Sequence, residues 1–135
     1  MTLTDTGPLV ALIDESDGYH VRVKQAARAI SWPMVTTEAC LTEALYLLGE
    51  SAGWPGQEAL WLFVSDNSLG VLNSPINGPR RASGFMKRFR DQPCDYADAT
   101  LLVAAEETGL RRIFTIDKHF NAYRLTNGES VEIIL

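Results

Sequence analysis

The amino-acid sequence predicts an α/β fold of three layers, with helices on both faces of a central, mainly parallel sheet. Short runs rich in β-branched and apolar residues alternate along the chain with one or two helical segments, as they do in parallel sheets. The clearest unit is a helix that begins after Asp95, ends at Gly109 and leads into an apolar strand at residues 113–116. A helix that feeds a buried strand is one half of a β-α-β unit.

Five short segments are expected to form the strands, because each combines apolar or β-branched residues with turn signals nearby. The second segment follows the break at Trp32-Pro33, and the third precedes a turn-rich link at residues 73–78. The fifth follows a loop at residues 123–128. We expect the strands at residues 1–4, 34–36, 68–72, 113–116 and 131–135.

Proline, threonine and glycine residues mark where the helices begin and end. Pro8, Pro55 and Pro79 suit the first turn of a helix, where the N–H that proline lacks has no partner in any case. Thr37 can cap a helix that Gly49 would end. We expect the helices at residues 9–13, 19–30, 38–48, 55–64, 79–89 and 96–108.

Length and composition fit one globular domain, because 135 residues are enough to bury a sizeable core. No apolar run approaches the ~20 residues that a membrane span needs, so we expect no membrane segment. No signal peptide is visible, and Cys40 and Cys94 lack metal-site spacing, so we expect reduced thiols and a cytoplasmic location. The net charge of −5 argues against a general nucleic-acid coat protein but not against a nuclease with an acidic site.

Carboxylates occur where the predicted strands end. Asp5 and Asp117 each follow a strand, and Asp98 begins the helix that precedes the second of these strands. Because the carboxyl ends of parallel strands lie at one edge of the sheet, we expect these three acids to converge there. Glu43 lies inside a helix among apolar neighbours, where a solvated charge is not expected. Local alternatives remain open for the others: helix caps for Asp5 and Asp95, the helix dipole for Asp98, an Asx turn for Asp117.

Gathered carboxylates repel each other unless a cation neutralises them. A cluster of oxygen ligands without Cys or His favours a hard ion, Mg²⁺ or Mn²⁺, over zinc. Such ions stabilise phosphoryl oxygens and lower the pKa of bound water. The pattern therefore indicates hydrolysis of phosphodiester bonds.

Four segments in register carry a resemblance to a known family: residues 3–12, 43–48, 95–99 and 115–120. They are similar to the motifs of PIN-domain ribonucleases, and most of all to the VapC-type toxins of toxin–antitoxin pairs. The resemblance implies a single PIN-like nuclease domain over residues 1–135 and a metal-dependent endoribonuclease that leaves 5′-phosphate and 3′-hydroxyl ends. It also implies a homodimer and a small antitoxin protein that blocks the acidic cleft.

The resemblance further implies the roles of particular residues. The acids that bind the metal, and so carry catalysis, would be Asp5, Glu43, Asp98 and Asp117. Asp95 matches an accessory acidic position. Thr6 and Thr115 fall at hydroxyl positions beside these acids, where they would orient a carboxylate or a water.

A basic cluster lies outside the motifs. Arg80, Arg81, Lys87 and Arg88 share one helical face, which either binds RNA phosphates or is ordinary solvated surface. His119 is interpreted as a surface residue rather than a general base. The six consecutive apolar residues 59–64 cover more than one helix face and indicate a partner surface.

Two other classes of protein are alternatives to a metal-dependent nuclease. A phosphatase of the haloacid-dehalogenase type also has an Asp at the end of its first strand, but it needs a second Asp two residues later, where this chain has Gly7. A non-catalytic PIN-like module that binds RNA or protein remains the alternative to the nuclease.

Overall fold

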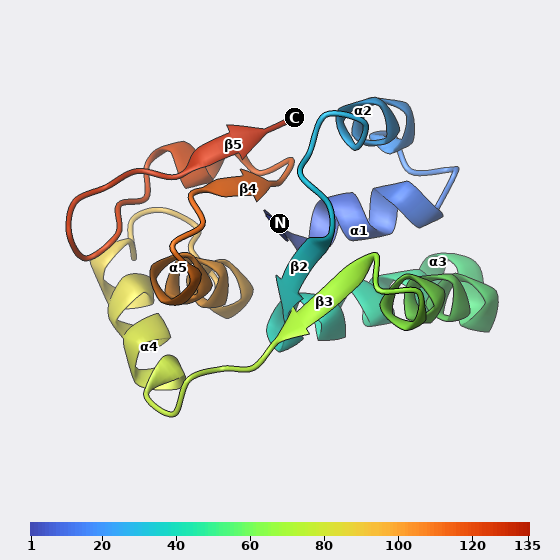
Figure 1. The fold of residues 1–135 in the computed structure, drawn as a ribbon. Coiled ribbons are helices and arrows are strands. Elements are labelled where there is room, and N and C mark those ends of the chain that lie inside the picture. Colours follow the sequence, from blue (N-terminus) through green and yellow to red (C-terminus); the bar gives the residue numbers. More distant parts are fainter.

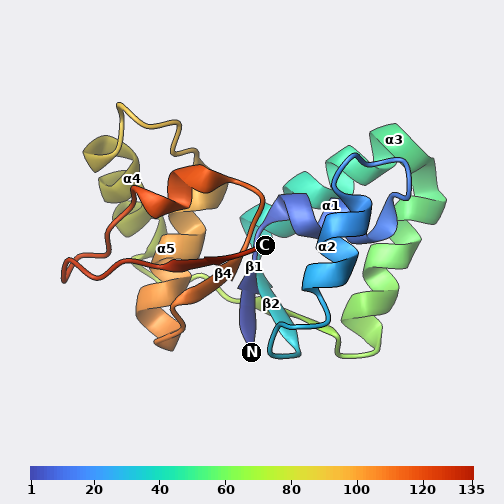
Figure 2. The same ribbon diagram turned by 90° about the horizontal axis from the view of Figure 1, so that it is seen from above.

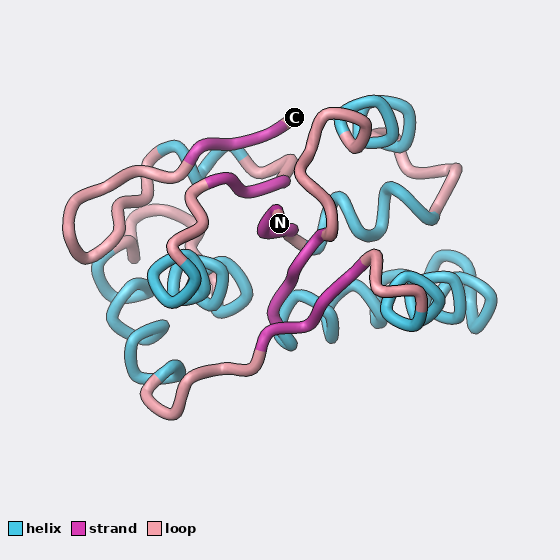
Figure 3. Tube along the Cα trace, in the orientation of Figure 1, coloured by secondary structure: helices cyan, strands magenta, loops and turns pink.

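Five parallel strands form the central sheet of the protein in a computed structural model that describes residues 1–135 (Figures 1 and 3). Every neighbouring pair of strands is parallel, and the order across the sheet is β3-β2-β1-β4-β5. The chain therefore builds outward from β1 in one direction and then returns to add β4 and β5 on the other side, with a topological switch point between β1 and β4. The strands are β1 (Thr2–Thr4), β2 (Met34–Thr37), β3 (Leu69–Leu72), β4 (Arg112–Phe114) and β5 (Glu132–Ile134).

Helices cover both faces of the sheet, which confirms the predicted three-layer architecture. In Figure 2, α4 and α5 lie on one side of the strands, and α1, α2 and α3 lie on the other. The helices are α1 (Thr6–Ile13), α2 (His20–Ala26), α3 (Glu38–Ser65), α4 (Gly78–Arg88) and α5 (Tyr96–Thr108), with a 3-10 helix at Lys118–Asn121. None of them combines the length and the apolar character that crossing a membrane would require.

The buried side chains form two hydrophobic clusters, one on each face of the sheet. Leu3 and Ile113 belong to the cluster beneath α4 and α5, whereas Met34 and Phe114 belong to the cluster beneath α1, α2 and α3. Ile113 and Phe114 are consecutive, so they point to opposite faces as strand geometry requires. The sheet is thus buried on both sides, which is typical of parallel sheets.

Helix α5 has both of the end signals predicted for it. Asp95 and Asp98 form a reciprocal capping box at its beginning, and Gly109 ends it with a φ of 76°. A positive φ is sterically easy only for glycine, so the sequence itself fixes this end. The eight buried residues of α5 include its whole apolar run from Leu101 to Ala105.

Two expected helices have clearly different bounds in the structure. The first begins at Thr6, earlier than predicted, because Asp5 caps it, which is one of the alternatives left open for this acid; Pro8 is therefore the third residue of the helix and not the first. The helix expected at 19–30 ends at Ala26. There the indole N–H of Trp32 donates a hydrogen bond to the carbonyl of Ala27. The chain then turns toward β1, where the backbone N–H of Thr2 donates to the carbonyl of Pro33.

The two helices expected at 38–48 and 55–64 form one element, α3, interrupted only at Gly53, where φ is 65°. Gly49 does not end the first half. Gln57 donates a 3.0 Å hydrogen bond to the carbonyl of Leu45, and a Cβ at Gly49 would lie 2.7 Å from the Gln57 amide nitrogen. Glycine at position 49 therefore makes room for the side chain that bridges the break.

Candidate active site

The site begins at the switch point, where β1 and β4 end side by side. Asp5 follows β1, and its backbone N–H donates a 2.9 Å hydrogen bond to the carbonyl of Phe114 at the end of β4. Both oxygens of the Asp5 carboxylate are held: Oδ1 accepts from Thr6 N at 2.8 Å, and Oδ2 accepts from the Thr115 hydroxyl at 2.7 Å. Asp5 is only 8% exposed. Two hydrogen bonds, one from the next residue in the chain and one from the residue that follows β4, thus fix a nearly buried carboxylate at this edge of the sheet.

Asp98 approaches Asp5 from the first turn of α5. Its backbone N–H donates to Asp95 Oδ1 at 2.8 Å, and its own Oδ2 accepts from the backbone N–H of Asp95 at 3.2 Å. The second carboxylate oxygen of Asp98 makes no hydrogen bond, although the residue is only 6% exposed. Asp95 is exposed and contributes a second negative charge beside it. The capping role and a ligand role are therefore compatible in this pair.

Glu43 differs from its expectation, because its side chain is exposed rather than enclosed by apolar neighbours. It lies on α3 beside Asp95, in a shallow depression of about 470 Å³ that Ala39, Thr42 and Tyr96 also line. Partial burial raises the pKa of Glu43, and the charges of Asp95 and Asp5 raise it further. Glu43 therefore lies within the electrostatic influence of the acids at the sheet edge.

Asp117 does not directly follow a strand as predicted, since β4 ends at Phe114. It caps the 3-10 helix, where its Oδ1 accepts from His119 N at 2.9 Å and lies 2.6 Å from His119 Nδ1. The backbone N–H of Asp117 donates to the Thr115 hydroxyl oxygen at 2.9 Å. His119 itself is an exposed residue, in agreement with its placement on the surface.

The electrostatics of the cluster are strongly unfavourable to negative charge. Burial raises the pKa of Asp5, and the charges of Asp117 and Asp95 act in the same direction. Burial together with the charges of Asp95, Asp5 and Asp117 raises the pKa of Asp98 to about 8. No Lys or Arg forms an ion pair with Asp5, Glu43, Asp95 or Asp98; the one ion pair at the site joins Asp117 to His119. This excess of carboxylates is the charge distribution that a divalent cation would neutralise.

The chemistry of the donors fits Mg²⁺ or Mn²⁺ better than a softer metal. Cys40 lies close, with its Sγ 3.8 Å from Asp5 Oδ1, but burial raises the pKa of this thiol to about 12, so the thiol is protonated in the metal-free protein. The carboxylates do not close into a group of three that could hold an ion as their side chains stand. Repulsion among unneutralised carboxylates favours such separation.

The four basic residues of α4 are not brought together as one free surface. Arg81 is engaged in ion pairs with Glu106, at 2.9 Å, and with Glu107. The Arg88 guanidinium lies over the ring of Phe89, 5.0 Å from its centroid, and donates to the carbonyl of Leu125 at 3.4 Å. Arg80 and Lys87 are exposed, and their side chains have no partner. Only this second pair is free to meet a phosphate backbone.

Some residues near the site were not singled out from the sequence. Tyr123 is fully buried, and its hydroxyl has no hydrogen-bond partner. Burial and the charge of Asp98 raise the pKa of this hydroxyl well above its usual range. Thr37, which caps α3 as predicted, also joins the end of β2 to α5, because its hydroxyl lies 2.8 Å from that of Thr100. No local pattern predicts this contact or the position of Tyr123, because both depend on elements far apart in the sequence.

Comparison with known proteins gives consistent results. The family model described as "PIN domain" matches residues 2–125. Ribonuclease VapC26 of Mycobacterium tuberculosis (strain ATCC 25618 / H37Rv) is 24% identical over 133 residues, which cover 98% of each chain.

Two solved structures are similar in fold. VapC20 of Mycobacterium tuberculosis, described as a sarcin-ricin loop cleaving toxin, matches with a TM-score of 0.83 at 19% identity, over 90% of this chain and 94% of that one. PAE2754 of Pyrobaculum aerophilum matches with a TM-score of 0.56 at 18% identity, over 98% of this chain and 87% of that one.

Proposed function

The chain belongs to the PIN-domain family, and from this premise we propose that it is a metal-dependent endoribonuclease, the toxin of a toxin–antitoxin pair. The observation that carries the proposal is the set of acids without a compensating cation at the switch point of the sheet, two of which, Asp5 and Asp98, are almost fully buried. Ligand sites of open α/β sheets lie at such points. The similarity to Ribonuclease VapC26 over nearly the whole chain supports RNA as the substrate.

In the proposed mechanism, Asp5, Glu43, Asp98 and Asp117 would hold Mg²⁺ or Mn²⁺. The chemistry that such an ion would supply is neutralisation of charge on the phosphate and a bound water of lowered pKa. Thr115 keeps Asp5 in one orientation through its hydroxyl. Thr6 donates its backbone N–H to the other oxygen of Asp5, and its own hydroxyl donates to the carbonyl of Cys40 at 3.3 Å.

Asp95 has an accessory role in this mechanism. It holds Asp98 by the capping box, so that one oxygen of Asp98 is fixed and the other is left for the ion. Its own charge adds to the field that draws a cation into the cleft. Loss of Asp95 should therefore matter less than loss of the acids it supports.

A protein partner is part of the proposal. Helix α3 exposes several large apolar side chains along its length, and exposed apolar surface often marks a contact with another protein. These residues are Tyr46, Leu47, Trp54, Trp61 and Leu62. We assign this α3 apolar surface to a homodimer contact, and we expect an antitoxin to block the acidic cleft.

Cys40 and Cys94 are free thiols, which fits the reducing cytoplasm.

Cleavage of total cellular RNA with Mg²⁺ or Mn²⁺ tests the proposal, with EDTA as the control. Asp5→Asn should abolish most of the cleavage, whereas Asp91→Asn, an equal charge change at an exposed position outside the site, should leave it intact. Cleavage that persists in EDTA would contradict the metal mechanism. RNA binding without any cleavage by antitoxin-free protein would instead favour a non-catalytic binding module, for which the open arrangement of the carboxylates is the supporting observation.

A further inference from the structure

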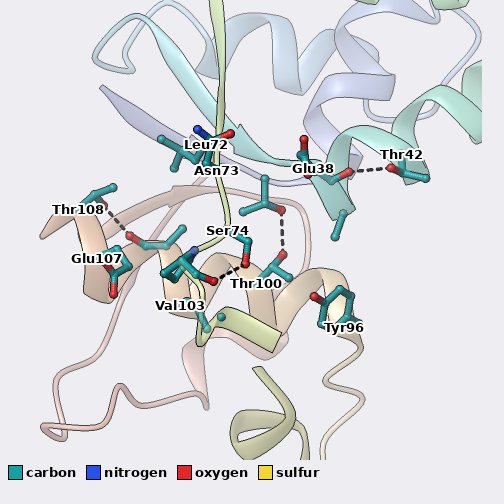
Figure 4. A pocket seen from close by; sticks show the side chains of 15 residues that line it. Glu38, Thr42, Leu72, Asn73, Ser74, Tyr96, Thr100, Val103, Glu107 and Thr108 are labelled. Atoms are coloured by element: carbon teal, nitrogen blue, oxygen red, sulfur yellow. Dashed lines mark hydrogen bonds between the residues drawn. The ribbon is translucent and has the colours of Figure 1, made fainter. Parts of the chain in front are cut away.

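A cavity of about 290 Å³ opens beside the proposed active site, between the beginning of α3, the flank of α5 and the link from β3 to α4 (Figure 4). Ala39, Thr42 and Tyr96 line both this cavity and the depression that contains Glu43 and Asp95. The two hollows are therefore continuous at their rims. A strand of RNA that lies along the carboxylates can place one group into the cavity without leaving the cleft.

The hydroxyls that line the cavity have already donated their protons within the protein. Thr100 donates to the carbonyl of Ala97 at 2.7 Å, so its 2.8 Å contact with Thr37 is one in which Thr37 is the donor. Thr108 donates to the carbonyl of Ala104 at 2.7 Å.

Two further hydroxyls at the rim follow the same rule. Thr42 donates to the carbonyl of Glu38 at 2.8 Å, and Ser74 donates to the carbonyl of Pro75 at 3.2 Å (Figure 4). What these threonine and serine hydroxyls offer to a ligand is lone pairs, so the part of the wall that they form is rich in acceptors; the Asn73 amide and the Tyr96 hydroxyl are the groups of the lining that can still donate.

The charges around the cavity point the same way. Its two charged lining residues are Glu38 and Glu107, of which Glu107 is paired with Arg81 outside the cavity, and no Lys or Arg lines the cavity itself. A phosphate is therefore disfavoured inside, whereas a neutral group with N–H donors is favoured. Leu72 and Val103 add apolar surface that the face of a base could contact. Tyr96, 44% exposed, stands at the shared rim, where its ring is available for stacking.

We propose that this cavity binds one unpaired nucleobase of the RNA substrate, next to the bond that is cut, and prefers a base with an exocyclic amino group over uracil. Sequence-specific recognition of RNA commonly uses bases that are splayed out, stacked on aromatic rings and read along their edges. The amino group of adenine or cytosine donates to the acceptor wall, whereas the corresponding carbonyl of uracil meets other acceptors. The inference rests on the proposed function for its choice of RNA, but the chemistry of the wall is independent of catalysis.

Binding can be measured without cleavage. The full chain carrying Asp5→Asn, with labelled threonine methyl groups, is titrated in Mg²⁺ with hexaadenylate, hexacytidylate and hexauridylate RNA. The methyls of Thr37, Thr100 and Thr108 should shift with hexaadenylate or hexacytidylate at concentrations about fivefold lower than with hexauridylate. Thr126, which lies in a different hollow, serves as the control. Absence of shifts with all three RNAs, or equal shifts with hexauridylate, overturns the proposal.

Matched variants separate stacking from edge recognition. Tyr96→Ala should weaken binding of the preferred hexamer by about tenfold, as loss of a base–aromatic stack does, whereas Tyr96→Phe should keep it. Thr100→Val preserves shape and removes an acceptor, so it should reduce the preference over hexauridylate. If Tyr96→Phe and Tyr96→Ala weaken binding equally, or neither changes it, the stacking role is wrong.

The outcomes distinguish this inference from the proposed function. Methyl shifts in a protein that cuts no RNA would support the base site and contradict the proposed nuclease activity. Cleavage by wild type, together with threonine methyl signals that do not shift on addition of RNA, would support the nuclease activity and contradict the base site. Shifts at Thr37 and Thr100 that follow protein concentration, without RNA, would show that a second copy covers the cavity and would overturn the assignment to a base.

Discussion

The hydroxyl of Thr115 joins two acids of the site, because it donates to Asp5 Oδ2 at 2.7 Å and accepts from the backbone N–H of Asp117 at 2.9 Å. Thr115 is fully buried and comes directly after Phe114, the last residue of β4. One side chain thus connects the end of β1, the end of β4 and the turn that carries Asp117.

Thr115→Val should therefore impair both stability and cleavage. Valine has nearly the same shape but leaves Asp5 Oδ2 and the N–H of Asp117 without a partner, which should lower the free energy of unfolding by about 1–3 kcal/mol. Urea unfolding at neutral pH measures this loss. Thr115→Ser keeps the hydroxyl and should retain most of the cleavage activity. If valine and serine behave alike, the hydroxyl does not position Asp5.

The raised pKa of Asp98 predicts how stability changes with pH when no metal is present. The folded state holds a proton on Asp98 up to a pKa of about 8, whereas the unfolded chain loses it near the ordinary aspartate pKa of 3.8. The stabilisation from this group is thus fully present below pH ~4 and is lost as the pH rises through ~8. Melting temperatures in EDTA should fall over this range, and Asp98→Asn should flatten the fall.

Metal should reverse this loss at pH 8, because an ion that binds the folded state stabilises it by mass action. Mn²⁺ in millimolar excess should raise the melting temperature of wild type, and Asp98→Asn should reduce that gain while raising the metal-free melting temperature. Asp91→Asn controls for the change of net charge. A wild type whose melting temperature ignores Mn²⁺, and which shows no metal binding by calorimetry, would identify the cluster as structural.

The basic residues of α4 should separate into two functional pairs. Arg80→Ala together with Lys87→Ala should weaken RNA binding and reduce the slope of log affinity against log salt by up to about 2, since each phosphate contact contributes roughly 0.7–0.9. Arg81→Ala should instead act on folding, because it removes the contacts to Glu106 and Glu107. These contacts are partly exposed, so the cost should be within about 1 kcal/mol. Fluorescence anisotropy across a salt series, paired with urea unfolding, tells the two apart.

How far the sequence predicts this fold depends on the range of each signal. The ends of α5 are predicted correctly because the capping box and Gly109 act within four residues of the helix. The end of α2 is not predicted correctly, because it depends on a hydrogen bond that the indole N–H of Trp32 donates to the carbonyl of Ala27. Continuity of α3 past Gly49 depends likewise on Gln57, eight residues away in the sequence.

The same distinction applies to the site. The rule that ligand sites lie at the carboxyl ends of parallel strands predicts that Asp5 lies at this edge of the sheet, and the structure has Asp5 there, because strand order is the only premise of that position. The pairing of Arg81 with Glu106 could not be predicted, since the two residues are 25 positions apart and meet only when α4 packs on α5. The acceptor character of the Thr37–Thr100 cavity is a property of hydrogen-bond directions, which no residue pattern specifies.

The last prediction separates an enzyme from a binding module. If Asp5, Glu43, Asp98 and Asp117 hold one metal centre, losing any of them removes the same function, so their effects on cleavage should be strongly non-additive. Asp5→Asn alone should remove most of the cleavage, and Asp98→Asn in addition should cost little more. RNA affinity should hold or improve in each variant, because a neutral amide repels phosphate less than a carboxylate does. Asp95→Asn should be milder, since asparagine also caps helices well.

Cleavage rates for the two single variants and the double variant, measured on one RNA substrate with Mg²⁺, test this directly. Additive losses on a logarithmic scale would mean that Asp5 and Asp98 act separately and do not share an ion. Residual cleavage in the double variant, at the rate of wild type in Mg²⁺, would place the chemistry outside this cluster altogether. Equal losses in the singles and the double, with RNA binding retained, are the result expected of one metal-holding unit at the edge between β1 and β4.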